Sequence, residues 1–245
     1  MAGQDFTAGN LKQRIRDGER VVGVMVPIAM ARAELERVLN RRHFDFVWTD
    51  TQSSAFNEEQ LVAFCEMAHG LGKRVQLRIK HTENTYMIDG YLQLGPSGVM
   101  IPQVSTEATV KEALRRFYYP PVGERSWGGA ARVGASARID RVDYARWWNR
   151  YGVLWLQLES VEAVTNARLL AKEGVDCVSF GKADLLFRLE SHPEYPLRTV
   201  DDCVRNVVSQ LKSSGVAVGF TSGSPAESDR YAAMGVTVFL EGPPE

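Results

Sequence analysis

Acidic, basic and amide side chains stand at the ends of several short apolar runs in this sequence. Gln157 and Glu159 are two positions apart, so on a strand both side chains point to the same side. Asp184 follows the next apolar run, and Arg78 closes an earlier one. Two carboxylates suit a hard divalent ion such as Mg²⁺ or Mn²⁺, and an arginine can hold a carboxylate through two parallel hydrogen bonds. The pattern predicts a small-molecule carboxylate substrate and a metal held by Glu159 and Asp184.

A divalent ion beside an arginine is the combination that enolate chemistry next to a carbonyl group requires. The ion stabilises the developing oxyanion, and the arginine orients the acid. The backbone N–H groups of the turn before Asp184 can bind the same anion. Our substrate-binding candidates are Arg78, Gln157, Gly181, Lys182, Ala183 and Trp127, and our catalytic candidates are Arg78, Asp50, Ser53 and His81.

The charged candidates also have purely structural interpretations. Glu159 could cap a helix that begins near Val161, and Asp184 could cap its own short helix. Arg78 could form a surface ion pair, and a lone histidine such as His81 is often exposed to solvent. Only the combination on one predicted face favours a functional site.

Eight short runs rich in β-branched residues alternate with longer stretches of helical period. Most of the runs are continuously apolar, as in parallel strands that are covered on both faces. We predict strands over residues 21–26, 44–49, 74–78, 98–101, 153–158, 177–180, 216–220 and 236–240.

This alternation predicts an α/β fold of the (β/α)₈ TIM-barrel type, with its active site at the carboxyl ends of the strands. No linker or low-complexity tract divides the chain, so we expect a single domain over residues 1–245. The sequence ends soon after the eighth run, at Leu240-Glu-Gly-Pro-Pro-Glu245, which indicates a shortened C-terminus without the helix expected there.

The segment 118–138 is too rich in Gly, Pro and Arg for a packed element. A long loop inside a domain is often functional, so we predict a lid that brings Trp127 over an aromatic or other bulky substrate. The alternative is that Tyr119 and the two following prolines brace the loop while its tip moves.

The composition excludes several classes of partner. With 29 Lys plus Arg against 30 Asp plus Glu, the net charge is −1, which gives no reason to bind nucleic acid or acidic membranes. The mean hydropathy is −0.21, and no apolar run approaches the roughly 20 residues of a membrane span. The first six residues do not resemble a signal peptide. Cys65, Cys177 and Cys203 form no CxxC motif, which favours reduced thiols in a cytoplasmic protein.

The chain resembles the HpcH/HpaI family of metal-dependent aldolases over about residues 23–240. The segments that carry the resemblance are 44–50, 99–104, 119–125, 156–159 and 174–185, together with Arg78. The resemblance implies a phosphoenolpyruvate/pyruvate-type barrel in which Arg78 holds the pyruvate carboxylate and Glu159 and Asp184 bind the metal. Gln157 and Gly181 would line the same pocket. It also implies a homo-oligomer, a dimer, trimer or hexamer, although the short tail lacks the last helices that family members exchange.

The sequence departs from the family at two positions that transfer the proton during aldol cleavage. Family aldolases read Gly-Glu-His after the second-strand aspartate, whereas this chain reads Thr51-Gln52-Ser53, and Gln93 stands where the partner aspartate is expected. Serine and glutamine have no side-chain pKa near neutrality, so the family's proton shuttle cannot operate here. A metal-bound water, Asp50 through a water, or His81 could replace it.

The leading hypothesis is a divalent-metal carbon–carbon lyase that performs retro-aldol cleavage through a stabilised enolate. A metal-dependent oxo-acid decarboxylase and a catalytically degenerate oxo-acid-binding protein are the alternatives. A phosphate-binding barrel enzyme is a fourth possibility, because residues 219–224 are rich in Gly and Ser, but Glu241 after the eighth run would repel phosphate.

Overall fold

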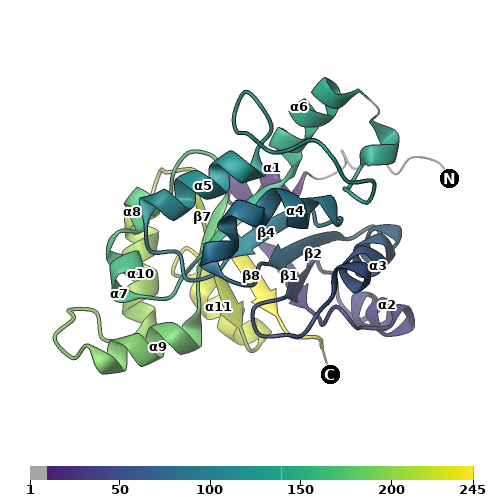
Figure 1. The fold of residues 1–245 in the computed structure, drawn as a ribbon. Helices are drawn as coiled ribbons and strands as arrows, with labels where there is room; N and C mark the ends of the chain where they lie inside the picture. Colours follow the sequence, from purple (N-terminus) through teal and green to yellow (C-terminus); the bar gives the residue numbers. More distant parts are fainter. Residues whose placement is uncertain (1–9, 139, 245) are drawn as a thin grey trace.

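Eight parallel strands close into a barrel in chain order (Figure 1) in the computed structural model, which describes residues 10–138 and 140–244. The strands are β1 (Val21–Met25), β2 (Phe46–Asp50), β3 (Arg74–Arg78), β4 (Gly98–Ile101), β5 (Val153–Leu158), β6 (Cys177–Phe180), β7 (Ala217–Ser222) and β8 (Val238–Glu241). Each predicted strand is present, and the (β/α)₈ prediction is confirmed. Residues 1–9, on which the signal-peptide prediction falls, lie outside the described residues.

Helices follow the strands and surround the barrel (Figure 1). They are α1 (Leu11–Arg16), α2 (Arg32–Arg41), α3 (Glu58–Gly70), η1 (Thr82–Met87), α4 (Ile88–Gln93), α5 (Glu107–Phe117), η2 (Ala135–Ala137), α6 (Arg141–Tyr151), α7 (Val161–Thr165), α8 (Ala167–Leu170), α9 (Lys182–Ser191), α10 (Val200–Leu211) and α11 (Pro225–Ala232). Several begin at an Asn, Asp, Ser or Thr whose side chain accepts a hydrogen bond from the first turn, as Thr106 does for α5. In the described residues after β8, up to Pro244, no helix follows.

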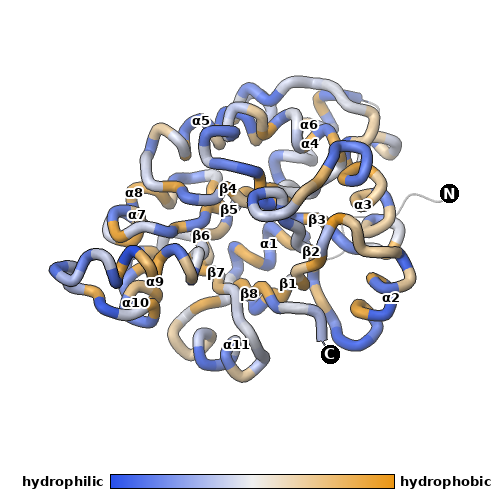
Figure 2. Tube along the Cα trace, turned by 60° about the horizontal axis from the view of Figure 1, so that its bottom comes forward, coloured by the Kyte–Doolittle hydropathy of each residue, from blue (hydrophilic) through white to orange (hydrophobic). Residues whose placement is uncertain are grey.

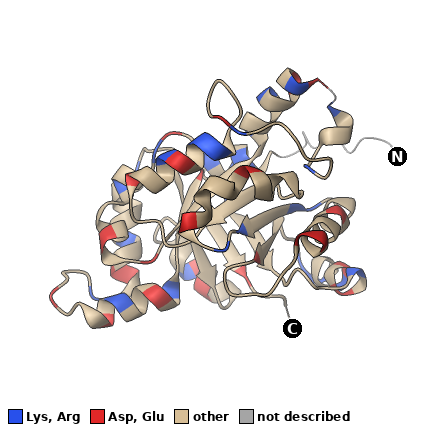
Figure 3. Cartoon of the chain, in the orientation of Figure 1, with Lys and Arg blue, Asp and Glu red and all other residues tan. Residues whose placement is uncertain are grey.

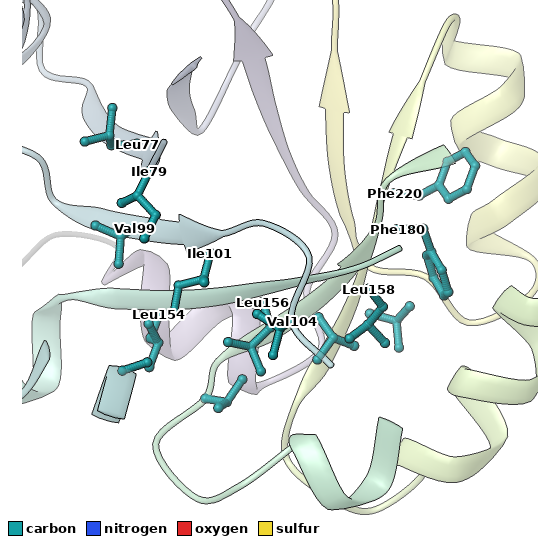
Figure 4. Close-up of a cluster of buried hydrophobic side chains, with 14 of the residues drawn as sticks. Leu77, Ile79, Val99, Ile101, Val104, Leu154, Leu156, Leu158, Phe180 and Phe220 are labelled. Carbon is teal, nitrogen blue, oxygen red and sulfur yellow. The ribbon is translucent and has the colours of Figure 1, made fainter. Parts of the chain in front are cut away.

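Apolar side chains cover both faces of the barrel wall, which is why the strands read as continuous apolar runs. Those that point outward pack under the helices; Figure 4 shows Leu77, Val99 and Leu156 among them. Those that point inward, such as Trp48 and Trp155, fill the barrel interior. Hydrophobic residues therefore gather along the strands and the inner helix faces in Figure 2.

The amino-terminal end of the barrel is covered by α1. Leu11 and Ile15 belong to the interior cluster. The buried Nζ of Lys12 donates to Asp176 Oδ2 at 2.8 Å, to the Tyr118 hydroxyl at 2.7 Å and to the Gly152 carbonyl at 2.8 Å. This network ties α1 to the residues just before β5 and β6.

The segment 118–138 lies at this same amino-terminal end, between α5 and β5. Its arginines stack on aromatic rings: Arg125 Cζ is 4.2 Å from the centre of the Trp148 ring, and Arg132 Cζ is 4.1 Å from that of Trp127. Tyr118 joins the Lys12 network, which fixes the start of the segment to the end of the barrel opposite the carboxyl ends of the strands. The predicted lid over the pocket of the same chain is therefore wrong.

Lys and Arg residues are interspersed with Asp and Glu residues along the helices (Figure 3). No helix in the described part of the chain is long and apolar enough to cross a membrane.

Candidate active site

A pocket of about 440 Å³ opens at the carboxyl ends of the strands. It is lined by Met25, Trp48, Asp50, Ser53, Arg78, Met100, Gln157, Glu159, Phe180, Gly181, Lys182, Ala183, Asp184, Thr221 and Leu240. Nine of the eleven candidate residues named from the sequence therefore line one pocket. The arrangement of their charges decides what the pocket can do.

Arg78 is the centre of the polar side of this pocket. Its Nε and Nη2 each donate to one oxygen of Asp50 at 2.7 Å, and its Nη1 donates to Gln157 Oε1 at 3.3 Å. Asp50 and Arg78 are direct neighbours in the register between β2 and β3, so the two strands themselves bring this pair together. The paired carboxylate fixes the guanidinium in one orientation at the pocket wall.

Asp50 is held as an anion. Burial alone would raise its pKa, but the hydrogen bonds and charge of Arg78, with the N–H groups of Gln52 and Ser53, lower the pKa below its ordinary value. Each of its two oxygens accepts two of these hydrogen bonds. This makes Asp50 a weak base near neutral pH.

Glu159 is buried directly against Gly181. A Cβ atom at position 181 would lie 2.1 Å from Glu159 Oε1, so only glycine leaves room for this carboxylate. The other oxygen, Oε2, is buried without a hydrogen-bond partner. Burial and the negative charge of Asp184 raise the pKa of Glu159 to about 7, against the opposing effects of Arg78 and the Gln103 backbone N–H.

Neither acid serves as the helix cap that the structural interpretation required. Ser160 caps α7, with its side chain accepting from Ala163 N at 3.1 Å. Gly181 precedes α9, and no side chain caps that helix. Two like charges facing one another, one of them buried with an orphaned oxygen, are unfavourable unless a cation or a proton lies between them.

The residues present therefore fit a divalent cation. Glu159 and Asp184 would hold it, and among the described residues no group of three or more His, Cys, Asp and Glu side chains forms a complete protein cage. Mg²⁺ commonly binds in this way, with one or two carboxylates and with water or substrate oxygens in the other positions.

Gln103 is a contributor that the sequence did not reveal. Its backbone φ of +51° is in the left-handed region, which is uncommon for a residue other than glycine. In this conformation its N–H reaches Glu159. No sequence signal marks such a position, because the residue is neither Gly, Asn nor Asp.

A family model described as HpcH/HpaI aldolase/citrate lyase matches residues 23–240. The chain belongs to this family. A hydroxypyruvate/pyruvate aldolase from Pseudomonas aeruginosa is 25% identical over 243 residues, which cover 97% of this chain and 88% of the relative. A 2-keto-3-deoxy-L-rhamnonate aldolase from Salmonella gallinarum is 25% identical over 238 residues, covering 94% and 85%. The crystal structure of an HpcH/HpaI aldolase from Desulfitobacterium hafniense has a TM-score of 0.82 and 26% identity, covering 95% of this chain and 90% of that one.

Membership of the HpcH/HpaI family makes the chain an enzyme of the carbon–carbon lyase type. The residues that carried the resemblance now lie in one pocket: Arg78, Gln157, Glu159, Gly181 and Asp184 all line it. Their individual roles are part of the proposal below.

Gly181 and Lys182 have contacts in the structure that differ from the anion-binding role expected from the sequence, whereas Ala183 lines the pocket as expected. The N–H of Gly181 is used by the Leu158 carbonyl at 3.2 Å, so this glycine contributes the space for Glu159 and not an anion-binding N–H. The Lys182 ammonium pairs with Glu227 at 3.0 Å. The uncapped first turn of α9, with Ala183, keeps its place in the pocket lining.

Two candidates lie outside the pocket lining. His81 caps η1, where its Nδ1 accepts from Glu83 N at 3.1 Å. Trp127 packs on Tyr144 and Arg132 in the segment at the amino-terminal end of the barrel. The site therefore gives neither residue a contact with a substrate in the same chain.

The phosphate-binding alternative finds no support in the residues after β7. The Gly223 N–H donates to Glu227 at 2.7 Å, and Ser224 caps α11. Glu241 pairs with Arg42 and accepts from Ser228 at 2.7 Å. The Gly223 N–H is thus already engaged within the protein and is not free for a phosphate.

Proposed function

We propose that this HpcH/HpaI family member is a divalent-metal-dependent lyase that cleaves and forms the bond between C3 of a 2-oxo acid and the carbonyl carbon of an aldehyde. The observation that carries the proposal is the buried Glu159 carboxylate, whose Oε2 has no hydrogen-bond partner. Its pKa is raised by burial and by the charge of Asp184 and lowered by that of Arg78, and all three residues line the same pocket. A carboxylate pair opposite a fixed guanidinium suits a substrate with adjacent carbonyl and carboxylate groups.

Arg78 binds and orients the substrate carboxylate. Asp50 occupies one edge of the guanidinium and keeps it from rotating, so Asp50 acts as a positioning residue. Gln157 lies beside Nη1 and accepts its hydrogen bond until a substrate oxygen replaces it. The acid then lies with its carbonyl oxygen toward Glu159 and Asp184.

A divalent ion held by Glu159 and Asp184 supplies positive charge beside the carbonyl oxygen, where negative charge develops. In the cleavage direction the C3–C4 bond breaks, its electron pair moves into the C2–C3 bond, and the C4 hydroxyl gives up its proton as the aldehyde forms. C3 later takes a proton to give the free oxo acid. The step balances without an oxidant or reductant.

The proton is exchanged with solvent water at the pocket mouth. Asp50 has a lowered pKa, and His81 does not line the pocket. Ser53 lines it and offers a hydroxyl that can hold such a water, but it does not supply a base of its own. We expect slower turnover than an enzyme with a histidine at this position.

The test uses protein stripped of metal with a chelator and reloaded with Mg²⁺ or Mn²⁺. Cleavage of a 4-hydroxy-2-oxo acid is followed by trapping the released aldehyde. We expect activity only after reloading, and a loss of at least about 100-fold in Glu159→Gln and Arg78→Met. Full activity of the stripped protein, or of Glu159→Gln, contradicts the proposal.

Decarboxylation of an oxo acid is the second candidate function. It is favoured by the lack of a histidine in the described pocket lining, because loss of CO₂ needs no base to begin. Product analysis separates the two reactions, since released gas indicates decarboxylation and released aldehyde indicates aldol cleavage. Oxo-acid binding without either product would identify a degenerate binding protein.

A further inference from the structure

The pocket has an apolar side that the proposed chemistry does not use. The strands follow one another around the barrel in chain order, so β8, β1 and β2 form one continuous arc of the wall. Leu240, Met25 and Trp48 line the pocket from these strands. The metal-binding acids come from the ends of β5 and β6, on a different part of the ring.

Trp48 is the residue that joins this apolar arc to the substrate-binding arginine. It is two positions before Asp50 on β2, so both side chains point into the barrel. Arg78 Cζ lies 5.2 Å from the centre of the Trp48 ring. The indole Nε1 is buried and has no hydrogen-bond partner, so the part of Trp48 that lines the pocket is not its N–H group.

We infer that Trp48, with Met25 and Leu240, binds the substituent on C3 of the oxo acid and selects hydrogen or alkyl there over hydroxyl. The inference rests on the proposed function. With the carboxylate on Arg78 and the carbonyl oxygen toward Glu159 and Asp184, the C3 group contacts the rest of the wall, which also includes Met100, Phe180 and Thr221. The arc is the part of that wall next to Arg78, through Trp48. An alkyl group there replaces water against carbon atoms, whereas a hydroxyl group loses its water without gaining a partner from these three side chains.

The sharpest test compares 2-oxobutanoate with hydroxypyruvate. The two acids differ only by methyl against hydroxyl at the same position, and hydroxypyruvate appears in the name of a relative. We measure kcat/KM for addition of each acid to propanal by the Mg²⁺-loaded enzyme. We expect 2-oxobutanoate to be preferred by roughly 10- to 100-fold, the range over which an apolar pocket discriminates such isosteres.

Variants locate the preference. Trp48→Gln places an amide on the arc, so the kcat/KM values of the two acids should then differ by less than about 3-fold. Trp48→Phe should keep the preference for 2-oxobutanoate. Trp155→Phe is the matched control, because Trp155 fills the barrel interior without lining the pocket. Thr221→Val tests the neighbouring hydroxyl on β7, which also lines the pocket. If Trp48→Gln fails to fold, the wild-type ratio and Trp48→Phe still decide the matter.

Calorimetric binding of both acids to the Mg²⁺-loaded protein separates the failure of this inference from that of the proposed function. Equal binding of the two acids, or tighter binding of hydroxypyruvate that Thr221→Val abolishes, overturns the role of Trp48 and leaves the lyase proposal intact. Binding of neither acid overturns both.

Discussion

At the scale of single residues, the site depends on a close contact between a carboxylate and a backbone. Glu159 occupies the space that any side chain at position 181 would need, and this contact places its oxygens toward Asp184. The electrostatic cost of burying it beside a like charge is the strongest physical argument for a cation in this pocket. We make three predictions at this scale, two on this contact and one on Ser53, which lines the same pocket.

Gly181→Ala should displace the Glu159 carboxylate, because the new Cβ would lie 2.1 Å from Oε1. We expect Mg²⁺ affinity and aldol cleavage to fall by at least about 10-fold, measured by calorimetry and by aldehyde release. Gly90→Ala is the control, since a Cβ there meets nothing within 4 Å. Unchanged Mg²⁺ affinity in Gly181→Ala would show that Glu159 does not hold the ion.

Mg²⁺ affinity should depend on pH through Glu159, whose pKa is raised to about 7 in the metal-free protein. Below pH 7 the ion must displace a proton, so affinity should rise by about 10-fold per pH unit and level off above pH 7. Without metal the sign of the stability effect is opposite. The folded state holds this proton between about pH 4.5 and 7 while the unfolded chain releases it, so stability falls as pH rises through that window.

Calorimetry from pH 5.5 to 8.5 measures the affinity, and urea unfolding of metal-free protein measures the stability. Glu159→Gln should remove this contribution to the stability slope. An affinity that is the same at pH 6 and pH 8 would contradict the assignment.

Ser53→His should raise the cleavage rate by about 10- to 100-fold, because it restores a near-neutral base at the position where the family carries histidine. The pH–rate profile should gain an inflection near the ordinary histidine pKa of about 6.5. Ser53→Ala serves as the control and should stay within about 3-fold of wild type. A Ser53→His variant that is no faster would place the proton transfer elsewhere.

At the scale of elements, the two ends of the barrel differ in structure. The carboxyl ends of the strands carry the pocket, and α1 with the segment 118–138 closes the other end. In that closure Lys12 and Asp176 form a fully buried pair, joined by Arg16. Burial lowers the pKa of Lys12 to about 8, against the opposing effect of Asp176. The charged form of Lys12 therefore depends on Asp176.

Lys12→Met should destabilise the protein by about 3 kcal/mol or more, because it leaves the buried Asp176 with only part of its compensation. Urea unfolding at pH 7 measures the effect. Breaking the exposed pair of Arg20 and Asp229 by Arg20→Ala should cost less than about 1 kcal/mol. At temperatures where Lys12→Met is folded, its KM should match wild type, since the pocket lies at the opposite end; a changed KM would show that the ends are coupled.

The sequence was sufficient to predict the strands and to predict that Glu159 and Asp184 lie together. It was not sufficient to predict every contact in the site. Continuous apolar runs identify the strands because both faces of each strand are buried, and strand ends that converge explain why Glu159 and Asp184 were found together. The Asp50–Arg78 pair depends on the register between β2 and β3, which no sequence pattern fixes. Trp48 looked like any apolar strand residue. The place of Trp127 was predictable in principle, because a connection from a helix to a strand lies at the amino-terminal end of the barrel.

At the scale of the whole molecule, we propose that residues 1–245 form one domain. The eight strands close on one another, and contacts such as Lys12 with Asp176 and Arg42 with Glu241 join distant parts of the sequence. Urea unfolding should therefore give coincident transitions by tryptophan fluorescence and by circular dichroism. Saturating Mg²⁺ should raise the midpoint in wild type but not in Glu159→Gln. Two separated transitions in the metal-free protein would contradict a single domain.

The separation between the closed end and the open end of the barrel has a practical consequence. The buried Lys12 network and the stacked arginines lie at the closed end, whereas the side chains that we propose select the substrate line the pocket at the open end. Variants of the pocket residues can thus be screened in a protein that has first been stabilised by substitutions at the amino-terminal end of the barrel. The two sets of substitutions can be chosen independently. Such a scaffold would let new oxo-acid preferences be explored without eroding heat resistance.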